Sequence, residues 1–204
     1  MRHSRRNFSQ GLVISIMAGC TGCIDPQGVP GSVDLIWGRR GISDGRFLKP
    51  RAITIDSNDV LYIVDTTGRI QAFSPEGEFL RVWRTPAAKD GRPTGLGFDM
   101  TDNHLLVADT HYYQMLCYTL EGELVPEKVI GGVQGTEPGQ FSFITDAVRD
   151  STGNFYTGED SDVDRIQKFD ASGQFMMQWG TTGSEPGKFV RPQGLAIDEK
   201  DHLW

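Results

Sequence analysis

Three loops of this 204-residue chain concentrate side chains that could bind or transform a ligand. Each loop follows a short apolar run and begins with an acid, and these acids are Asp65, Asp109 and Asp160. The loops also contain residues that do not recur, namely His111, Tyr112, Tyr113, Asp162 and Asp164. Carboxylates, imidazoles and phenols can hold cations, hydrogen-bond a polar ligand or transfer protons. The functional interpretation is a polar binding rim around a central pocket.

The recurring acids also have a structural explanation. An Asp that follows the same run in every repeat can accept hydrogen bonds from nearby backbone N–H groups and stabilise a turn. The residues that do not recur are therefore the better functional candidates. The alternative explanation is that they are exposed loop residues without a functional role. We name no catalytic residue from the sequence.

Metal-binding patterns in the sequence are weak. Spaced oxygen ligands occur in the segments 56–59, 99–102 and 198–201, whereas residues 150–154 occupy the same place with a plain turn sequence. The three spaced segments lack the Gly and the bidentate Glu of an EF-hand loop, so we interpret all four segments as hairpin turns. A zinc site at Cys20 and Cys23 would need two further ligands, and no second C-x-x-C is present. We identify no cofactor, and neither calcium nor zinc has support.

A repeated unit must position these loops. Residues 179–198 read W-G-T-T-G-S-E-P-G-K-F-V-R-P-Q-G-L-A-I-D, and residues 37–56 and 130–150 repeat the order of glycines, Gly-x-Phe and an apolar run ending in Asp. The acids that end these runs are Asp56, Asp99, Asp150 and Asp198, spaced by 43, 51 and 48 residues. Each unit contains four short alternating runs, a pattern that predicts one β-propeller blade and an all-β fold.

The repeat resembles the NHL repeat. The resemblance rests on the Gly-rich loop, on Pro-x-Gly-Leu-Ala-Ile-Asp at 192–198 and on Arg-Ile-Gln at 69–71 and 165–167. It covers residues 33–204 and implies a propeller, commonly of six blades. The copies depart from the family at the position of its usual His, which is here Gly68, Tyr113 and Asp164.

The resemblance also implies an enzymatic alternative. Peptidyl-hydroxyglycine amidating lyases look similar in repeat pattern and hold zinc through His residues at that family position, which this chain lacks. Gluconolactonase-like propellers use a carboxylate-bound metal, for which we find no motif. A metal-dependent lyase or lactonase-like hydrolase, with its site completed by further blades, is the alternative function.

The predicted propeller is partial. We expect blades at about residues 50–83, 93–131 and 144–180, and an incomplete blade at 192–204. Residues 33–38 match only the last strand of a blade. Six blades would need roughly 270 residues, so the sequence predicts a truncated chain of about three full blades with open sheet edges.

The first 20 residues predict an export signal. A basic stretch precedes the short apolar segment 11–19, which is too short to span a bilayer as a helix. Residues 4–8 resemble the twin-arginine export signal.

A lipid anchor is predicted at the end of this signal. Residues 17–20 resemble a bacterial lipobox with Cys20 as the lipid-bearing residue, although Met17 stands where Leu is usual. The Gly- and Pro-rich segment 21–32 predicts a flexible tether. We expect an exported, lipid-anchored protein of the periplasm or cell envelope.

The charge balance restricts the partners. The chain has 20 Lys and Arg against 27 Asp and Glu, a formal charge of −7. An acidic surface repels phosphate backbones, so we exclude nucleic acid. The leading prediction is a cell-envelope binding scaffold for a protein, peptide or glycan, without an evident catalytic site.

Overall fold

The computed structural model describes residues 33–204, and residues 38–204 form a unit of their own. The predicted signal, Cys20 and the tether at 21–32 lie outside the described residues. Within residues 33–204 no helix has the length and apolar character needed to cross a bilayer.

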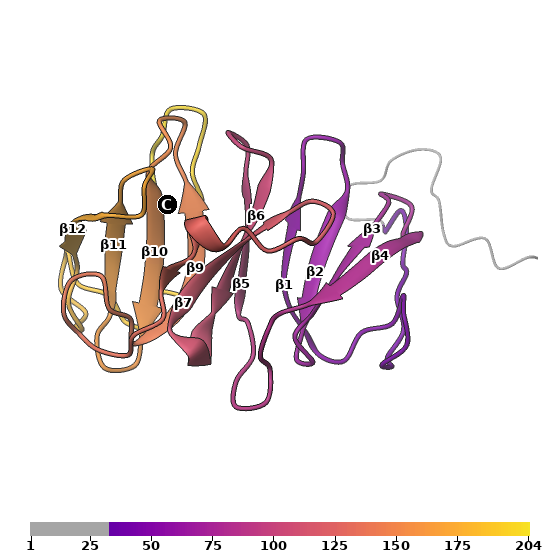
Figure 1. Ribbon diagram of the computed structural model, residues 1–204, viewed down its shortest axis with the longest axis horizontal. Helices are drawn as coiled ribbons and strands as arrows, with labels where there is room; N and C mark the ends of the chain where they lie inside the picture. The colour runs from indigo at the N-terminus through magenta and orange to yellow at the C-terminus, as the bar shows by residue number, and fades with distance from the viewer. Residues whose placement is uncertain (1–32) are drawn as a thin grey trace, which may run out of the picture. The chain divides into compact units, whose positions relative to one another are not determined.

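Residues 50–179 form three four-stranded antiparallel sheets, each with its strands side by side in chain order (Figure 1). The first sheet consists of β1 (Pro50–Ile55), β2 (Leu61–Asp65), β3 (Arg69–Phe73) and β4 (Phe79–Arg84). The second consists of β5 (Gly95–Asp99), β6 (His104–Asp109), β7 (Gln114–Thr119) and β8 (Ile130–Gly131), with the 3-10 helices η1 (Thr110–Tyr112) and η2 (Pro126–Lys128). The third consists of β9 (Phe143–Arg149), β10 (Phe155–Asp160), β11 (Arg165–Phe169) and β12 (Phe175–Trp179). The predicted all-β fold of four-stranded blades is confirmed.

Apolar side chains between successive sheets form two cores. The strand β6 contributes to both because neighbouring side chains of a strand point to opposite faces. Leu105 and Val107 pack in the core that includes Tyr62 of the first sheet, whereas Leu106 and Ala108 pack in the core that includes Phe155 of the third. The second sheet is therefore buried on both faces, which explains why its strands read as continuous apolar runs.

Three Gly-rich loops have the same conformation. An isolated parallel bridge closes each loop, and these bridges are Arg40–Phe47, Gln134–Phe141 and Thr182–Phe189. The glycine before each loop has a positive φ and packs against the ring of the Phe that ends the loop. A Cβ atom on Gly38, Gly131 or Gly180 would lie 2.7, 2.4 or 2.3 Å from that ring.

Substitution of Gly131 by Ala should destabilise the fold by about 3 kcal/mol or more. The left-handed conformation alone costs a side chain about 1–2 kcal/mol, and the added Cβ would lie 2.4 Å from the Phe141 ring and 2.5 Å from the Tyr113 carbonyl. Gly187→Ala is the matched control, since Gly187 also has a positive φ (84°) but has nothing within 4 Å of the added carbon. Urea unfolding measures the free energy of unfolding of both variants. Equal losses of stability in Gly131→Ala and Gly187→Ala would contradict the packing explanation.

Candidate functional site

The two ends of each blade carry different segments. At one end, which we call the loop end, the Gly-rich loops contact the loops between the second and third strands, as when Thr66 N–H donates to the Leu48 carbonyl at 3.2 Å. The opposite end, the hairpin end, carries the turns between first and second strands and between third and fourth strands. All the sequence-predicted rim residues lie at the loop end.

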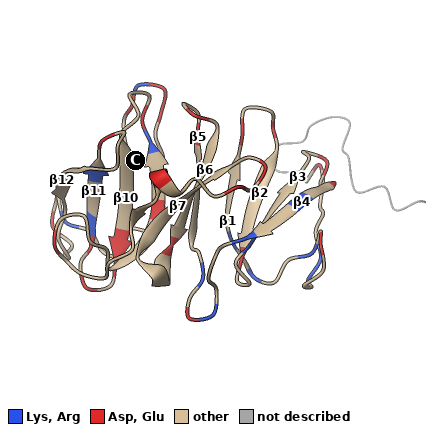
Figure 2. Ribbon diagram, viewed as in Figure 1, with Lys and Arg blue, Asp and Glu red and all other residues tan. Residues whose placement is uncertain are grey.

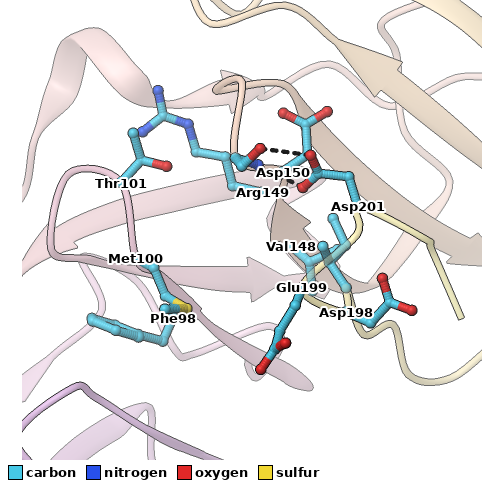
Figure 3. Close-up of a pocket in the computed structure, with 11 residues that line it drawn as sticks. Phe98, Met100, Thr101, Val148, Arg149, Asp150, Asp198, Glu199 and Asp201 are labelled. Atoms are coloured by element: carbon cyan, nitrogen blue, oxygen red, sulfur yellow. Dashed lines mark hydrogen bonds between the residues drawn. The ribbon is translucent and has the colours of Figure 1, made fainter.

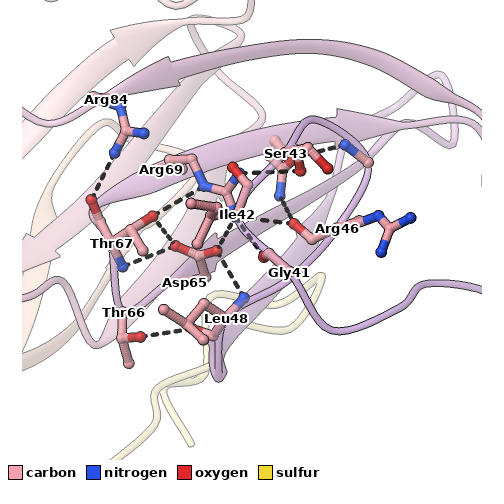
Figure 4. A network of polar contacts seen from close by, with 12 residues as sticks. Gly41, Ile42, Ser43, Arg46, Leu48, Asp65, Thr66, Thr67, Arg69 and Arg84 are labelled. Atoms are coloured by element: carbon pink, nitrogen blue, oxygen red, sulfur yellow. Dashed lines mark hydrogen bonds and ion pairs between the residues drawn. The ribbon is translucent and has the colours of Figure 1, made fainter.

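In the first blade, Arg69 holds the Gly-rich loop in place (Figure 4). Its buried guanidinium donates to the carbonyls of Ile42 (2.6 Å) and Arg46 (3.0 Å) and pairs with Asp65 Oδ2 at 2.6 Å. Although burial raises the pKa of Asp65, hydrogen bonds from Arg69 and Thr67 bring it below its usual value. Both carboxylate oxygens of Asp65 are therefore engaged in holding the loop, as the structural explanation of the recurring acids expects.

The third blade repeats this arrangement. Arg165 pairs with Glu159 at 2.6 Å and donates to the carbonyls of Thr136 (2.6 Å) and Gln140 (2.9 Å) in the Gly-rich loop. The strand register pairs Glu159 with Arg165, so Glu159 occupies the position that Asp65 has in the first blade. This corrects the sequence alignment, in which Asp160 was equivalent to Asp65; β10 simply has two acids in succession.

The second blade lacks the arginine. Its register pairs Asp109 with Gln114, which stands where the other blades have Arg. Gln114 Nε2 donates to Asp109 Oδ2 at 3.1 Å, but Oδ1 is buried without a hydrogen-bond partner among the described residues. Burial raises the pKa of Asp109 to about 6. At this position of the repeat, the acids of the first and third blades are paired with Arg, whereas the buried Asp109 of the second blade has no ion-pair partner among the described residues.

Aromatic side chains gather beside Asp109. The rings of His111 and Phe143 have centroids 4.8 Å apart, and Tyr113 stacks on Phe143 at 6.1 Å with an interplanar angle of 12°. His111 is exposed, whereas Tyr113 and Phe143 are half-buried. Tyr112 turns to another partner, because its hydroxyl accepts the Asp90 N–H at 3.2 Å.

Phe143 was missed in the sequence. It lies two residues after Phe141, and the corresponding residues after Phe47 and Phe189 are Lys49 and Arg191. This exchange of a basic residue for a ring is the signal that could have identified it.

Asp160 lies next to this aromatic group. It is the cross-strand partner of Phe143, and its Oδ2 accepts from Arg191 Nε (3.2 Å) and Gln193 Nε2 (2.9 Å) in the fourth repeat. The rim cluster, as we call it, consists of His111, Tyr113, Phe143, Asp160 and Arg191. The structure thus brings three of the predicted rim residues into one surface.

The remaining predicted residues lie outside the rim cluster. Asp162 is exposed in the loop after β10, and its backbone N–H donates to Ser142 Oγ at 3.1 Å. Asp164 is buried just before β11. Among the contacts observed in residues 33–204, none joins either side chain to the rings of His111, Tyr113 and Phe143.

A second departure from the repeat lies deeper on β9. Asp146 stands where the register places Ala52 and Gly95 in the first two sheets. Its Oδ2 accepts the Leu195 N–H at 2.9 Å, and burial raises its pKa. A Cβ atom on Gly95 would lie 2.5 Å from Asp146 Oδ1, so a small residue is required opposite this carboxylate. Asp146 links the third blade to the fourth repeat.

One group of potential metal ligands occurs in the part of the chain that the structure describes. Ligand atoms of Asp99, Asp102 and His104 lie within 4.8 Å of one another at the hairpin end. Two basic side chains already neutralise them: Arg149 pairs with both carboxylates, and Lys128 Nζ lies 2.5 Å from Asp102 Oδ2. These contacts hold the pKa of Asp102 at about 2. The group is an ion-pair network, which disfavours a bound dication.

Comparison with known proteins agrees with this architecture. No protein-family model matches the chain. NHL repeat-containing protein 3 of Mus musculus is 28% identical over 168 residues, which cover 74% of this chain and 47% of that protein. Peptidyl-glycine alpha-amidating monooxygenase of Mus musculus is 33% identical over 112 residues, 52% of this chain and 11% of that protein. The chain spans about half the length of the first relative and about a tenth of the second.

Solved structures define the class of fold. The structure of streptogramin B lyase superposes with a TM-score of 0.59 at 14% identity, covering 81% of this chain and 49% of that one. The WD40 repeats of RRP9 superpose with a TM-score of 0.51 at 12% identity, covering 68% and 39%. The fold is that of a β-propeller. Among its distant relatives the chain is similar to an NHL repeat-containing protein.

Replacement of Asp109 by Asn should flatten the pH dependence of stability. Because burial raises the folded-state pKa to about 6 from 3.8, the folded protein binds this proton more tightly than the unfolded chain. The protonated Asp109 contributes on the order of 2 kcal/mol to the free energy of unfolding. This contribution is fully present below about pH 4 and is lost as the pH rises through 6. Urea unfolding between pH 4 and 7.5 measures it, with Asp162→Asn as the exposed control. Parallel curves for the wild type and Asp109→Asn would contradict this assignment.

Proposed function

We propose that this chain is a binding module of an exported propeller scaffold and that it binds a peptide at the rim cluster. The supporting observation is that non-repeating residues from two sheets and the fourth repeat converge on one loop-end surface. A protein that served only as a scaffold would not need these non-repeating residues, since the repeated residues already hold the loops. Departures from a repeat that have no structural purpose are expected at functional sites.

The chemistry of the rim cluster suits a peptide. Phe143 and Tyr113 offer partly exposed ring faces for apolar side chains, and rings of this kind are frequent anchors in interfaces. The side chain of Arg191 is 75% exposed and retains donors that Asp160 does not use. A guanidinium can hold a backbone carbonyl or a carboxylate through two parallel hydrogen bonds. The name of the mouse amidating monooxygenase denotes a peptide substrate for that relative.

His111→Ala and Tyr113→Asn should each weaken peptide binding by about five-fold or more, because each removes one ring from the platform while preserving the backbone. Asn tolerates the left-handed conformation (φ 56°) of Tyr113. Peptides selected from a random displayed library against the purified protein supply the ligands, and fluorescence anisotropy supplies the affinities. Met176→Ala, at an exposed position of β12, is the control and should change nothing.

Two results would contradict the peptide proposal. One is selected peptides that bind all variants equally, and the other is binding on a glycan array that depends on His111 while the peptide library yields no ligand. The second result would assign the same surface to a glycan.

We further propose that the module is held on a membrane through a lipid on Cys20, as residues 17–20 suggest. Cys20→Ala should then abolish incorporation of a radiolabelled or clickable fatty acid and move the protein to the soluble fraction. Cys117→Ala is the control, because Cys117 is buried in the core. Unchanged membrane fractionation of Cys20→Ala would refute the anchor.

The alternative function is a propeller enzyme, a metal-dependent lyase or a lactonase-like hydrolase. Asp109 favours it, because a carboxyl group with a pKa of about 6 can exchange a proton near neutral pH. The mouse monooxygenase and the streptogramin B lyase have names that denote enzymes. Mass spectrometry of the selected peptides after incubation distinguishes the alternatives, since conversion that is lost in Asp109→Asn would favour the enzyme.

A further inference from the structure

A cavity of about 620 Å³ opens at the hairpin end (Figure 3). The strand β9 runs from Phe143 in the rim cluster to Arg149 at the cavity, so the two sites lie at opposite ends of this strand. The ends of β5 and β9 and the turn of the fourth repeat line it. Its volume lies in the range of about 300–1,000 Å³ that is typical of small-molecule sites.

One part of the lining is apolar. Phe98 and Ile197 hold the same place in their repeats, directly before the acid that closes the first strand, and both are half-buried. In the third repeat Arg149 holds that place, and Val148, one residue earlier, adds a further apolar side chain to the lining. Met100 leaves 81% of its surface exposed. Figure 3 shows Phe98 and Met100 on one side of the cavity and Asp198 and Glu199 on the other. Exposed apolar surface in a concave site is a mark of a ligand site.

The other part of the lining is acidic. Burial raises the pKa of Asp150, but hydrogen bonds from Asn154 and Thr152 hold it at about 2. The His202 backbone N–H is the main cause that holds the pKa of Asp198 at about 2. Both groups are therefore ionised at neutral pH, although their oxygens are engaged within the turns.

Glu199 is the carboxylate that is available to a ligand. It is exposed and makes no hydrogen bond or ion pair with another residue between positions 33 and 204. Asp201, by contrast, accepts from the backbone N–H and the hydroxyl of Ser151 at 2.8 and 2.5 Å.

Two basic side chains beside the cavity are already paired with acids, whereas the exposed Lys200, between Glu199 and Asp201 in the sequence, makes no ion pair among residues 33–204. Arg149, the one basic residue in the lining, pairs with Asp99 and Asp102 and lies over the Phe155 ring at 4.7 Å. Lys168 Nζ lies 3.8 Å from Asp150 Oδ2. The ribbon in Figure 2 marks acidic residues at the neighbouring hairpin turns as well. The lining itself carries four acids, Asp150, Asp198, Glu199 and Asp201, against one basic residue, Arg149, so the field in the cavity is negative above its apolar walls.

We propose that this cavity binds a small organic cation with an apolar body, of the arylalkyl ammonium type. The apolar body would cover Phe98, Val148 and Ile197, and the ammonium group would donate to Glu199. A concave site with apolar walls focuses the field of its carboxylates and concentrates cations, and a cation near the Phe98 ring gains a further attraction. This site is separate from the proposed peptide surface and does not depend on it.

The test uses two probes of matched shape, phenethylammonium and neutral 2-phenylethanol, with isothermal titration calorimetry on the purified protein. The cation should bind at least about ten-fold more tightly than the alcohol, and its affinity should fall as salt is raised. Glu199→Gln should weaken the cation about five-fold and leave the alcohol unchanged. Met100→Ser, at a largely exposed position, should weaken both probes.

Glu121→Gln is the charge-matched control, since Glu121 is exposed on another hairpin turn and has no place in the cavity lining. It removes the same charge and should change the affinity for the cation less than two-fold. Equal affinity of the two probes, equal effects of Glu199→Gln and Glu121→Gln, or no cation binding at millimolar concentration would overturn the proposal. Because none of these variants lies in the rim cluster, this result does not decide peptide binding.

Discussion

The buried arginine that holds a Gly-rich loop in the first and third blades is the interaction on which the rest of the propeller depends. The loop at 131–141 carries the chain from the last strand of the second sheet to the first strand of the third, so its shape fixes how these two blades face each other. Backbone carbonyls in the loop need donors once they are buried. The planar guanidinium of Arg69 or Arg165 supplies several donors in one rigid group, and the buried acid beside it compensates the charge.

The second blade lacks that arginine, and its buried acid is left poorly satisfied. Gln114 reaches Asp109 with one hydrogen bond, so a buried carboxylic acid retains an unpartnered oxygen among the described residues. An unpaired buried polar atom costs on the order of 1–3 kcal/mol, which a purely structural blade would have no reason to retain. The same loop brings His111 and Tyr113 against Phe143. The weakest point of the repeat and its most distinctive surface therefore coincide, as is common at functional sites.

The antiparallel blade also separates two kinds of surface. Connections from the second to the third strand and from blade to blade meet at one end, where mixed charges and aromatic rings lie together. Short hairpins meet at the other end, where Asp residues follow or end the first strands. Their side-chain carboxylates accept backbone N–H groups of the turns, as Asp150 accepts from Asn154 and Asp198 from His202. The hairpin end is thus acidic because its turns are stabilised by Asp side chains. Asp150 and Asp198 also line the cavity between the turns and contribute to its negative field.

The sequence by itself determined the repeat, the four strands of each blade and the glycines of the connecting loops, because these depend on alternation and on backbone conformations that neighbouring residues encode. It also singled out His111 and Tyr113 as departures from the repeat. Only the tertiary structure decided that Glu159 rather than Asp160 is equivalent to Asp65, that Phe143 completes the aromatic surface, and that Arg149 neutralises Asp99 and Asp102. Arg149 and Asp99 are 50 residues apart, and local patterns carry no information on which distant side chains meet across two packed sheets.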